Sequence, residues 1–322
     1  MSGRRVFVTG ATGLLGSHLV QAAIERGAEV VCLVRDWVPR ARTVEEGWLD
    51  RVTQVRGELE DPGVLVRALN EHEIDTVFHT GAQTIVGTAA RAPLSTFESN
   101  VRGTWNLLEA CRSMAGSVQR IVLVSSDKAY GNCDRLPYTE ETPLRGRNPY
   151  DASKAAADVI AMSYFHTFGL PVSIARCANL YGPGDLNWNR LVPGTIRALL
   201  AGERPVIRSD GKFLRDWFFV KDAVDALLLL ADRIPQEGIV GEAFNFGTER
   251  TLPVLDVVRK ILLLAECPHL EPVILDQAKD EIRDQSLDCS KARERLPWKA
   301  RHGLDEGLRE TIAWYRARLR TG

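Results

Sequence analysis

Tyr150 and Lys154 stand four residues apart in the stretch NPYDASKAAAD. Four residues make about one helical turn, so both side chains would share one face of a helix. Asn148 as N-cap and Pro149 in the first turn predict that a helix begins there. A lysine ammonium beside a phenol favours the phenolate, which lowers the tyrosine pKa from about 10 and makes it a base nearer neutral pH. The same spacing also arises by chance on surfaces, so its meaning depends on the rest of the chain.

A second group of reactive side chains, Ser126, Asp127 and Lys128, closely follows the apolar run at 121–124. Such a run predicts a buried strand, so these side chains are expected where that strand ends. Two interpretations are open. Asp127 and Lys128 form a surface salt bridge, or they transfer protons as a pair whose pKa values are coupled.

The stretch TGATGLLG near the N-terminus spaces Gly10, Gly13 and Gly16 three residues apart. It lies between a predicted strand and a predicted helix. In that context glycines permit a tight turn and let backbone amides approach a pyrophosphate at the helix N-terminus. An ordinary strand-to-helix turn is the alternative, and the strand–turn–helix context favours a dinucleotide site.

The identity of the dinucleotide depends on the end of the second predicted strand, where Arg35 precedes Asp36. An acidic residue at this place binds the ribose hydroxyls of NAD, whereas an arginine accommodates the 2′-phosphate of NADP. Glu58, after the third strand, is expected to face the adenine. We predict NAD and leave NADP open.

Short apolar runs alternate with helical patterns through the first half of the chain. The runs predicted as strands span 5–10, 29–34, 52–57, 75–80, 119–126 and 171–177. The predicted helices span 14–26, 62–71, 95–113 and 150–168, and 35–50 is expected to be a loop or irregular helix. Runs rich in β-branched residues that alternate with helices are typical of a parallel sheet buried on both faces. We therefore predict an α/β fold with a Rossmann-like, doubly wound parallel sheet in a dinucleotide-binding domain of residues 1–178.

The sequence pattern changes after Cys177, where a stretch rich in Gly, Pro and Asn predicts a long loop. Later helices are expected at 191–202, 221–233 and 304–319, with a strand at 241–248. This pattern predicts a smaller C-terminal α/β lobe for the substrate over 179–322. Parts of 217–247 are expected to rejoin the first domain.

Composition excludes several classes of protein. The 322 residues carry 41 basic and 42 acidic side chains, so no basic excess indicates binding to nucleic acid or a membrane surface. No apolar stretch is long enough to span a bilayer, and no signal peptide is evident. The six cysteines are scattered without metal-ligand spacing, which predicts no metal site and a cytoplasmic location. His79 is expected to pack at a strand end, and His166 to serve a core or interface role.

Together these motifs resemble the extended short-chain dehydrogenases/reductases that act on nucleotide sugars. The resemblance covers essentially the whole chain, including FHTGAQ at 78–83, NLYGPGD and RDWFFVKDA. FHTGAQ departs from the alanine pair of most relatives, although Thr80 and Gly81 should still permit close approach to the cofactor. The resemblance implies that NAD contacts the following residues: Gly10, Thr12, Gly13, Leu14, Leu15, Gly16, Arg35, Asp36, Glu58, Leu59, Gly81, Ala82, Gln83, Asn100, Ser125, Tyr150 and Lys154.

Within this family SSDKAYG is similar to the signature of CDP-glucose 4,6-dehydratases, which serve deoxysugar and polysaccharide biosynthesis. The resemblance makes Tyr150, aided by Lys154 and Ser126, the base for the sugar 4-hydroxyl while NAD takes hydride from C4. It makes Asp127 the acid for the departing 6-hydroxyl and Lys128 the C5 base or its partner. The product would be a 4-keto-6-deoxy sugar.

The resemblance also names groups that would hold the nucleotide sugar and a second copy of the chain. The substrate residues are Gln83, Asn179, Arg190, Leu191, Arg215 and Arg283. A homodimer is expected through helices near 95–113 and 150–168. The alternatives are a nucleotide-sugar 4-epimerase, a 4,6-dehydratase for a GDP-, UDP- or dTDP-sugar, and a non-catalytic dinucleotide sensor.

Overall fold

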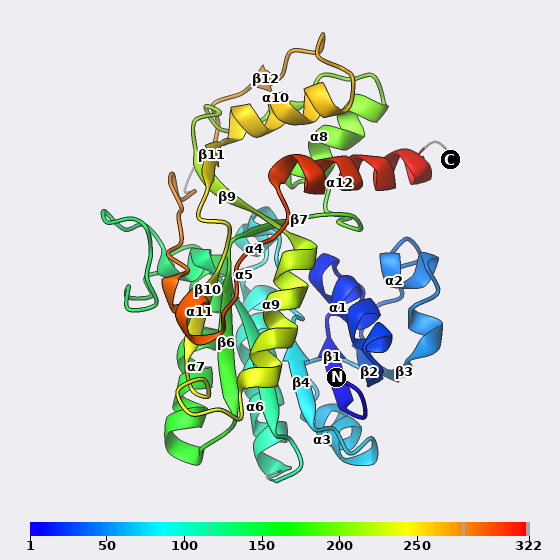
Figure 1. Ribbon diagram of the computed structural model, residues 1–322, viewed down its shortest axis with the longest axis vertical. Coiled ribbons are helices and arrows are strands. Elements are labelled where there is room, and N and C mark those ends of the chain that lie inside the picture. Colours follow the sequence, from blue (N-terminus) through cyan, green and yellow to red (C-terminus); the bar gives the residue numbers. More distant parts are fainter. Residues whose placement is uncertain (115, 279–280, 320–322) are drawn as a thin grey trace.

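The computed structural model describes residues 1–114, 116–278 and 281–319. Its centre is a seven-stranded sheet in which every neighbouring pair of strands is parallel (Figure 1). In spatial order the strands are β3 (Thr53–Arg56), β2 (Glu29–Val34), β1 (Arg5–Thr9), β4 (Thr76–His79), β5 (Arg120–Ser126), β6 (Val172–Cys177) and β10 (Ala243–Phe246). The inner strands are buried almost throughout, as continuous apolar runs require. The predicted Rossmann-like α/β fold is confirmed.

Helices cover both faces of this sheet and create two apolar cores. One core includes α1 (Leu14–Glu25) and α9 (Val220–Arg233), which pack against each other. The other includes α3 (Pro62–Glu71), α6 (Gly103–Ser113) and α7 (Pro149–Phe168). A short helix α2 (Arg42–Glu45) and a 3-10 turn at Leu49–Arg51 occupy the region expected to be irregular.

The helix predicted over 95–113 is not continuous, which corrects the sequence-based expectation. It divides into α5 (Pro93–Phe97), a π-helical turn (Glu98–Arg102) and α6. The wider turn carries Asn100 inward, where its side chain is buried and bonded to Gln83 and Ser153. Such π-turns often occur at functional sites. A further helix, α4 (Val86–Arg91), precedes α5 and was not predicted.

A second group of elements lies above the main sheet in Figure 1. A small sheet contains β11 (Thr251–Pro253), β9 (Leu214–Phe219) and β7 (Asn179–Tyr181), and β12 (Val273–Ile274) pairs with β8 (Val206–Ile207). The helices there are α8 (Leu191–Leu200), α10 (Val254–Leu264) and α12 (Leu304–Leu319), while α11 (Ser290–Arg295) contacts β10. Prediction missed α10, although its buried residues at 254, 257, 258, 261 and 262 have helical spacing.

The carboxyl ends of the central strands face this second group. In open parallel sheets, ligands bind in the crevice at these ends. The segment GEAFNFGT forms β10, as predicted, and adds an edge strand beside β6. Among the described residues, no helix combines the length and apolar character needed to cross a membrane.

His79 ends β4 as a packing residue, as expected. Its ring nitrogens lie 2.9 Å from the Thr9 hydroxyl and 3.0 Å from the Thr104 hydroxyl. Burial, and then the charge of Lys154, lowers the pKa of His79 to about 3. His166 instead lies exposed on α7.

We expect His79 to make the fold sensitive to acid. Its folded-state pKa lies below the unfolded value of 6.5, so its stabilisation is complete above pH 6.5 and is lost as pH falls toward 3. Between pH 7 and pH 5, the unfolding free energy of His79→Asn should fall by about 2 kcal/mol less than that of the wild type. Urea unfolding at both pH values measures this. The exposed His166→Gln control should follow the wild type, and parallel curves for all three proteins would refute the prediction.

Candidate active site

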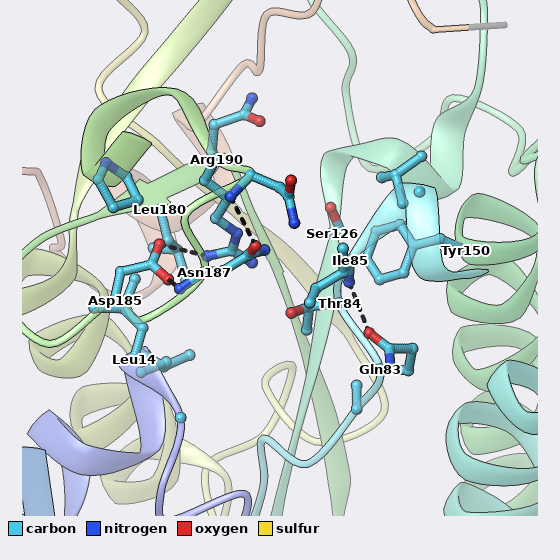
Figure 2. A pocket seen from close by; sticks show the side chains of 18 of the residues that line it. Leu14, Gln83, Thr84, Ile85, Ser126, Tyr150, Leu180, Asp185, Asn187 and Arg190 are labelled. Atoms are coloured by element: carbon cyan, nitrogen blue, oxygen red, sulfur yellow. Dashed lines mark hydrogen bonds and ion pairs between the residues drawn. The ribbon is translucent and has the colours of Figure 1, made fainter. Parts of the chain in front are cut away.

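A cavity of about 1440 Å³ lies between the carboxyl ends of the strands and the elements above them. Figure 2 shows side chains from both walls, with Ser126 and Tyr150 facing Arg190 and Asn187 across it. Most sequence-predicted site residues line it: Gly10, Thr12, Gly13, Leu14, Leu15, Gly16, Arg35, Asp36, Leu59, Gly81, Ala82, Gln83, Ser125, Ser126, Asp127, Lys128, Tyr150, Lys154, Asn179, Arg190, Leu191 and Arg215. Glu58, Asn100 and Arg283 do not.

The glycine loop between β1 and α1 is shaped for close approach. Gly10 has φ +73°, and a Cβ there would lie 2.8 Å from the backbone of Gly81. A Cβ on Gly16 would overlap the carbonyl oxygen of Gly10. The turn therefore excludes side chains at both positions, and α1 begins at Leu14 beside the cavity. This glycine-lined cradle at a helix N-terminus fits a dinucleotide pyrophosphate.

Arg35 and Asp36 directly follow β2 and line the same cavity as the glycine loop. The Arg35 Nε atom donates to Asp36 at 2.7 Å, and both side chains are more than half exposed. The guanidinium thus has a carboxylate partner, which would oppose a 2′-phosphate at this position. Glu58 is exposed outside the cavity, because β3 ends at Arg56 and it is Gly57, Leu59 and Glu60 that face inward. The expected role of Glu58 is corrected accordingly.

The helix α7 begins at the predicted place and brings Tyr150 to Ser126. Asn148 occupies the N-cap position and Pro149 the first helical position. Ser126 hydrogen-bonds the Tyr150 phenol, and burial raises the pKa of Tyr150 to about 12 despite that bond and the nearby Arg190 charge. The ammonium of Lys154 donates to the Val124 carbonyl at 2.9 Å, and burial lowers its pKa to about 8.

This arrangement corrects the expected electrostatics of the Tyr-x-x-x-Lys motif. Lys154 was expected to lower the pKa of Tyr150, but its Nζ atom is directed to the backbone of β5. Desolvation by burial dominates both groups and favours the neutral phenol and the neutral amine. Of the nearby groups, Arg190 is the cation that favours the phenolate.

Asp127 and Lys128 lie in the 3-10 turn after β5 (Asp127–Tyr130), where Asp127 is buried and Lys128 is half-buried. The Asp127 carboxylate accepts from Ser126 at 3.0 Å and from Asn179 at 3.4 Å. No ion pair between Asp127 and Lys128 occurs in the described part of the chain, so the surface salt-bridge interpretation is wrong. Burial raises the pKa of Asp127, and burial and then Arg215 lower the pKa of Lys128, so both shifts favour the uncharged forms.

Three further residues around Lys128 were not predicted. Its Nζ atom donates to Gln285 Oε1 at 3.4 Å. Asp151 is buried next to Tyr150, and burial raises its pKa to about 6. Glu281 lines the cavity. Asp151 directly follows the catalytic tyrosine candidate in sequence, which could have signalled it, whereas Gln285 and Glu281 arrive through a distant segment.

Arg215 and Arg283, both predicted as phosphate ligands, differ in whether their side chains reach the cavity. Arg215 is buried, and its guanidinium donates to the carbonyl groups of Ile282 and Arg283 at 2.6 and 2.7 Å. It lines the cavity and can still present charge there. The Arg283 side chain is exposed and lies outside the cavity lining, because its backbone faces Arg215. The expectation for Arg283 is corrected.

Arg190 and Leu191 stand at the start of α8. Figure 2 shows Arg190 on the wall opposite Tyr150. Arg190 donates to Asp185 at 3.3 Å, and Asp185 also accepts from the Asn187 amide at 3.0 Å. Asp185 and Asn187 line the cavity and were not predicted. In the described ranges no group of three or more His, Cys, Asp or Glu side chains could hold a metal ion.

Asn100 supports the site from behind instead of lining it. Its side chain accepts from the Gln83 amide at 2.7 Å and donates to the Gln83 carbonyl and the Ser153 hydroxyl at 3.0 and 2.9 Å. It thereby fixes the segment after β4 to α7. Its expected direct contact with the cofactor is corrected to a positioning role.

Comparison with known families agrees with this geometry. The family model described as GDP-mannose 4,6 dehydratase matches residues 7–311. The chain belongs to this family. The match confirms the resemblance to the extended short-chain dehydrogenases/reductases. The seven-stranded parallel sheet of this chain matches the Rossmann-like α/β fold of solved dehydratases in that group.

Individual nucleotide-sugar enzymes resemble this chain along nearly its whole length. A dTDP-glucose 4,6-dehydratase from Xanthomonas campestris is 32% identical over 96% of this chain and 92% of the relative. The structure of a dTDP-glucose 4,6-dehydratase from Streptomyces venezuelae with NAD bound has 30% identity and a TM-score of 0.87, covering 98% of this chain and 97% of that one. A UDP-glucose 4-epimerase from Thermotoga maritima with UDP-glucose has 28% identity and a TM-score of 0.87, covering 98% and 99%.

We expect Asn100→Ala to loosen this site through stability. Its removal leaves the part-buried backbone groups of Gln83 and the buried Ser153 hydroxyl without their side-chain partner, at a cost of about 2–3 kcal/mol in unfolding free energy. Denaturant unfolding measures the change. Asn70→Ala, at an exposed position of α3, is the matched control and should stay within about 0.5 kcal/mol of the wild type. Equal stability of the two variants would contradict the role given to Asn100.

Proposed function

We propose that this chain is an NAD-dependent nucleotide-sugar 4,6-dehydratase, with CDP-glucose as its substrate. The observation that carries the proposal is the pair of buried Asp127 and half-buried Lys128, which lie beside Ser126 and Tyr150 and form no ion pair with each other in the described part of the chain. Such a pair offers a proton donor and a proton acceptor next to an oxidation centre. Relatives named for the same reaction on dTDP-glucose support the reaction class.

The dinucleotide cradle supports NAD as the cofactor. The loop around Gly10, Gly13 and Gly16 would hold the pyrophosphate, and Asp36 would receive the adenosine ribose hydroxyls. NAD held by these residues would supply a hydride acceptor for the oxidation at C4 and a hydride donor for the reduction at C6. The pairing of Arg35 with Asp36 argues against a 2′-phosphate.

Oxidation at C4 requires removal of the 4-hydroxyl proton, and Tyr150 is the group placed to take it. Ser126 hydrogen-bonds the phenol and so orients it. Burial raises the pKa of Tyr150 to about 12 in this arrangement, so the phenol must lose its own proton before it can accept that of the 4-hydroxyl. The phenolate needs added positive charge, toward which Arg190 already contributes.

Elimination of water follows from the 4-ketone, which acidifies the C5 hydrogen. Lys128, favoured as a neutral amine, takes the C5 proton. Asp127, favoured as a neutral carboxyl, gives its proton to the 6-hydroxyl, which leaves as water as the C5–C6 double bond forms. Lys128 then gives its proton back to C5 as hydride reaches C6, and the proton taken from the 4-hydroxyl restores that of Asp127. Over the cycle, the 4-hydroxyl proton and the C6 hydroxide therefore account for the water released, and no net oxidation occurs.

The nucleotide sugar would span the cavity toward the second group of elements. Asn179, Arg190 and Arg215 line its walls as candidate phosphate ligands, and Gln83 and Leu191 would contact the sugar nucleotide. We propose that residues 1–178 mainly bind NAD and residues 179–322 mainly bind the nucleotide sugar. The Asp-Lys pair favours CDP-glucose by its resemblance, and the named relatives make dTDP-glucose the second candidate.

A 4-epimerase is the alternative reaction, because a solved epimerase has a similar fold. Epimerisation returns hydride to C4 and needs neither a C5 base nor an acid for the 6-hydroxyl. The two proton-transfer groups that follow Ser126 would then have no task. The pair therefore favours dehydration.

A substrate panel tests the reaction class and the nucleotide together. The purified protein with NAD is incubated with CDP-glucose, dTDP-glucose, UDP-glucose and GDP-mannose, and products are followed by mass. We expect loss of one water from CDP-glucose. An isomer of unchanged mass would favour epimerisation, and water loss from dTDP-glucose alone would overturn the nucleotide assignment.

We expect Asp127→Asn to separate oxidation from dehydration. The amide cannot donate a carboxyl proton to the 6-hydroxyl, so water loss should slow about 10²–10⁴-fold while C4 oxidation continues. Rapid quenching and mass detection of the 4-keto sugar measure both steps. Asp134→Asn, at an exposed position, is the control and should behave as the wild type. Equal slowing of both steps by Asp127→Asn would contradict its assigned role.

We also propose a homodimer through the face formed by α5, α6 and α7. Leu94, Trp105 and Val159 on these helices are 72%, 43% and 59% exposed. Val159→Glu should convert the dimer to a monomer in light scattering, because a buried charge would oppose association. Leu263→Glu, at an exposed apolar position of α10, should leave the mass unchanged. A monomeric wild type would overturn this assignment.

A further inference from the structure

The segment from Glu281 to Cys289 carries one side chain from a distant part of the chain to Lys128. The backbone amide of Gln285 donates to the Leu214 carbonyl at 3.1 Å, and the backbone amide of Tyr138 donates to the Ser286 carbonyl at 2.7 Å. These bonds anchor the backbone at Gln285 and at the residue that follows it. The position of its side chain is therefore set by the fold and not by a free loop.

The side-chain amide of Gln285 is fully buried, and only one of its two polar atoms has a hydrogen-bond partner among the described residues. Its Oε1 atom accepts from Lys128 Nζ at 3.4 Å. Its Nε2 atom has no hydrogen-bond partner in the described part of the chain. Leaving a buried donor unpaired costs about 1–3 kcal/mol, so this amide is expected to be retained for a reason other than stability.

We propose that Gln285 is a positioning residue that holds Lys128 in both of its protonation states during dehydration. This inference rests on the function proposed above. The amide oxygen accepts a hydrogen bond from the ammonium. After a half-turn of the terminal amide, its NH₂ group donates to the lone pair of the free amine. The now unpaired Nε2 atom is the donor that the second state uses.

The charges around Lys128 explain why a neutral partner suits this position. Arg215 from β9 faces it with like charge, and Asp127, Asp151 and Glu281 face it with opposite charge. None of the three carboxyl groups is within ion-pair distance of Lys128 in the described residues. A carboxylate at position 285 would be in direct contact and would hold the ammonium form. Glutamine gives orientation without that charge.

Gln285→Glu and Gln285→Met test the proposal through Lys128 itself. The rate at which an amine-acylating reagent labels Lys128 is measured by mass spectrometry from pH 6 to 11, with no substrate and no turnover. Only the neutral amine reacts, so the profile reports protonation. We expect Gln285→Glu to move the midpoint upward by about one pH unit or more, and to slow labelling at pH 7 about tenfold. Gln236→Glu, an exposed control, should not shift it.

Dehydration supplies the second readout. Gln285→Met should keep the labelling midpoint near that of the wild type, because no charge is added. Its water-loss step should slow at least several-fold at every pH, because Lys128 loses its hydrogen-bond partner. An unchanged midpoint in Gln285→Glu, or wild-type water loss in Gln285→Met, would overturn the proposal. A wild type that labels as expected yet removes no water from any sugar would instead overturn the proposed function.

Discussion

Asp127 and Lys128 occupy the turn that joins β5 to the cavity, and burial there changes what adjacent opposite charges do. In water such a pair would be a weak surface ion pair. Here desolvation outweighs their mutual attraction, and Arg215 adds to the effect on Lys128. Both shifts favour the uncharged forms, which are the forms that the proposed proton transfers require. The proposed transfer in both directions from a single turn depends on this balance.

The surrounding fold exists to bring this turn to the cofactor loop. Parallel strands place their carboxyl ends on one edge, so the glycine loop after β1 and the turn after β5 open into the same cavity. The helix α7 then adds Tyr150 from beside β5. Asn100 ties the segment after β4 to that helix, so three chain segments share one buried junction.

Much of this was predictable because it is local. Apolar runs, glycine spacing and the four-residue step from Tyr150 to Lys154 follow directly from short-range geometry. The pKa of Tyr150 was not, because it depends on burial by the whole fold and on Lys154 turning to Val124. Gln285 was also missed, since it reaches Lys128 across 157 positions of sequence. Arg283 and Glu58 were expected to face the ligands but lie outside the cavity lining, because the position of a residue in a motif does not fix which way a loop side chain points.

Deuterium placed at C4 of the sugar follows the central claim most directly. CDP-glucose and dTDP-glucose labelled at C4 are incubated with the protein and NAD, and the position of the deuterium in the product is determined by mass spectrometry and NMR. If one cavity performs oxidation, elimination and reduction in sequence, the deuterium will be found at C6 of a product that has lost one water. Deuterium returned to C4 in a product of unchanged composition would contradict the account, because Asp127 and Lys128 would then take no part in the reaction.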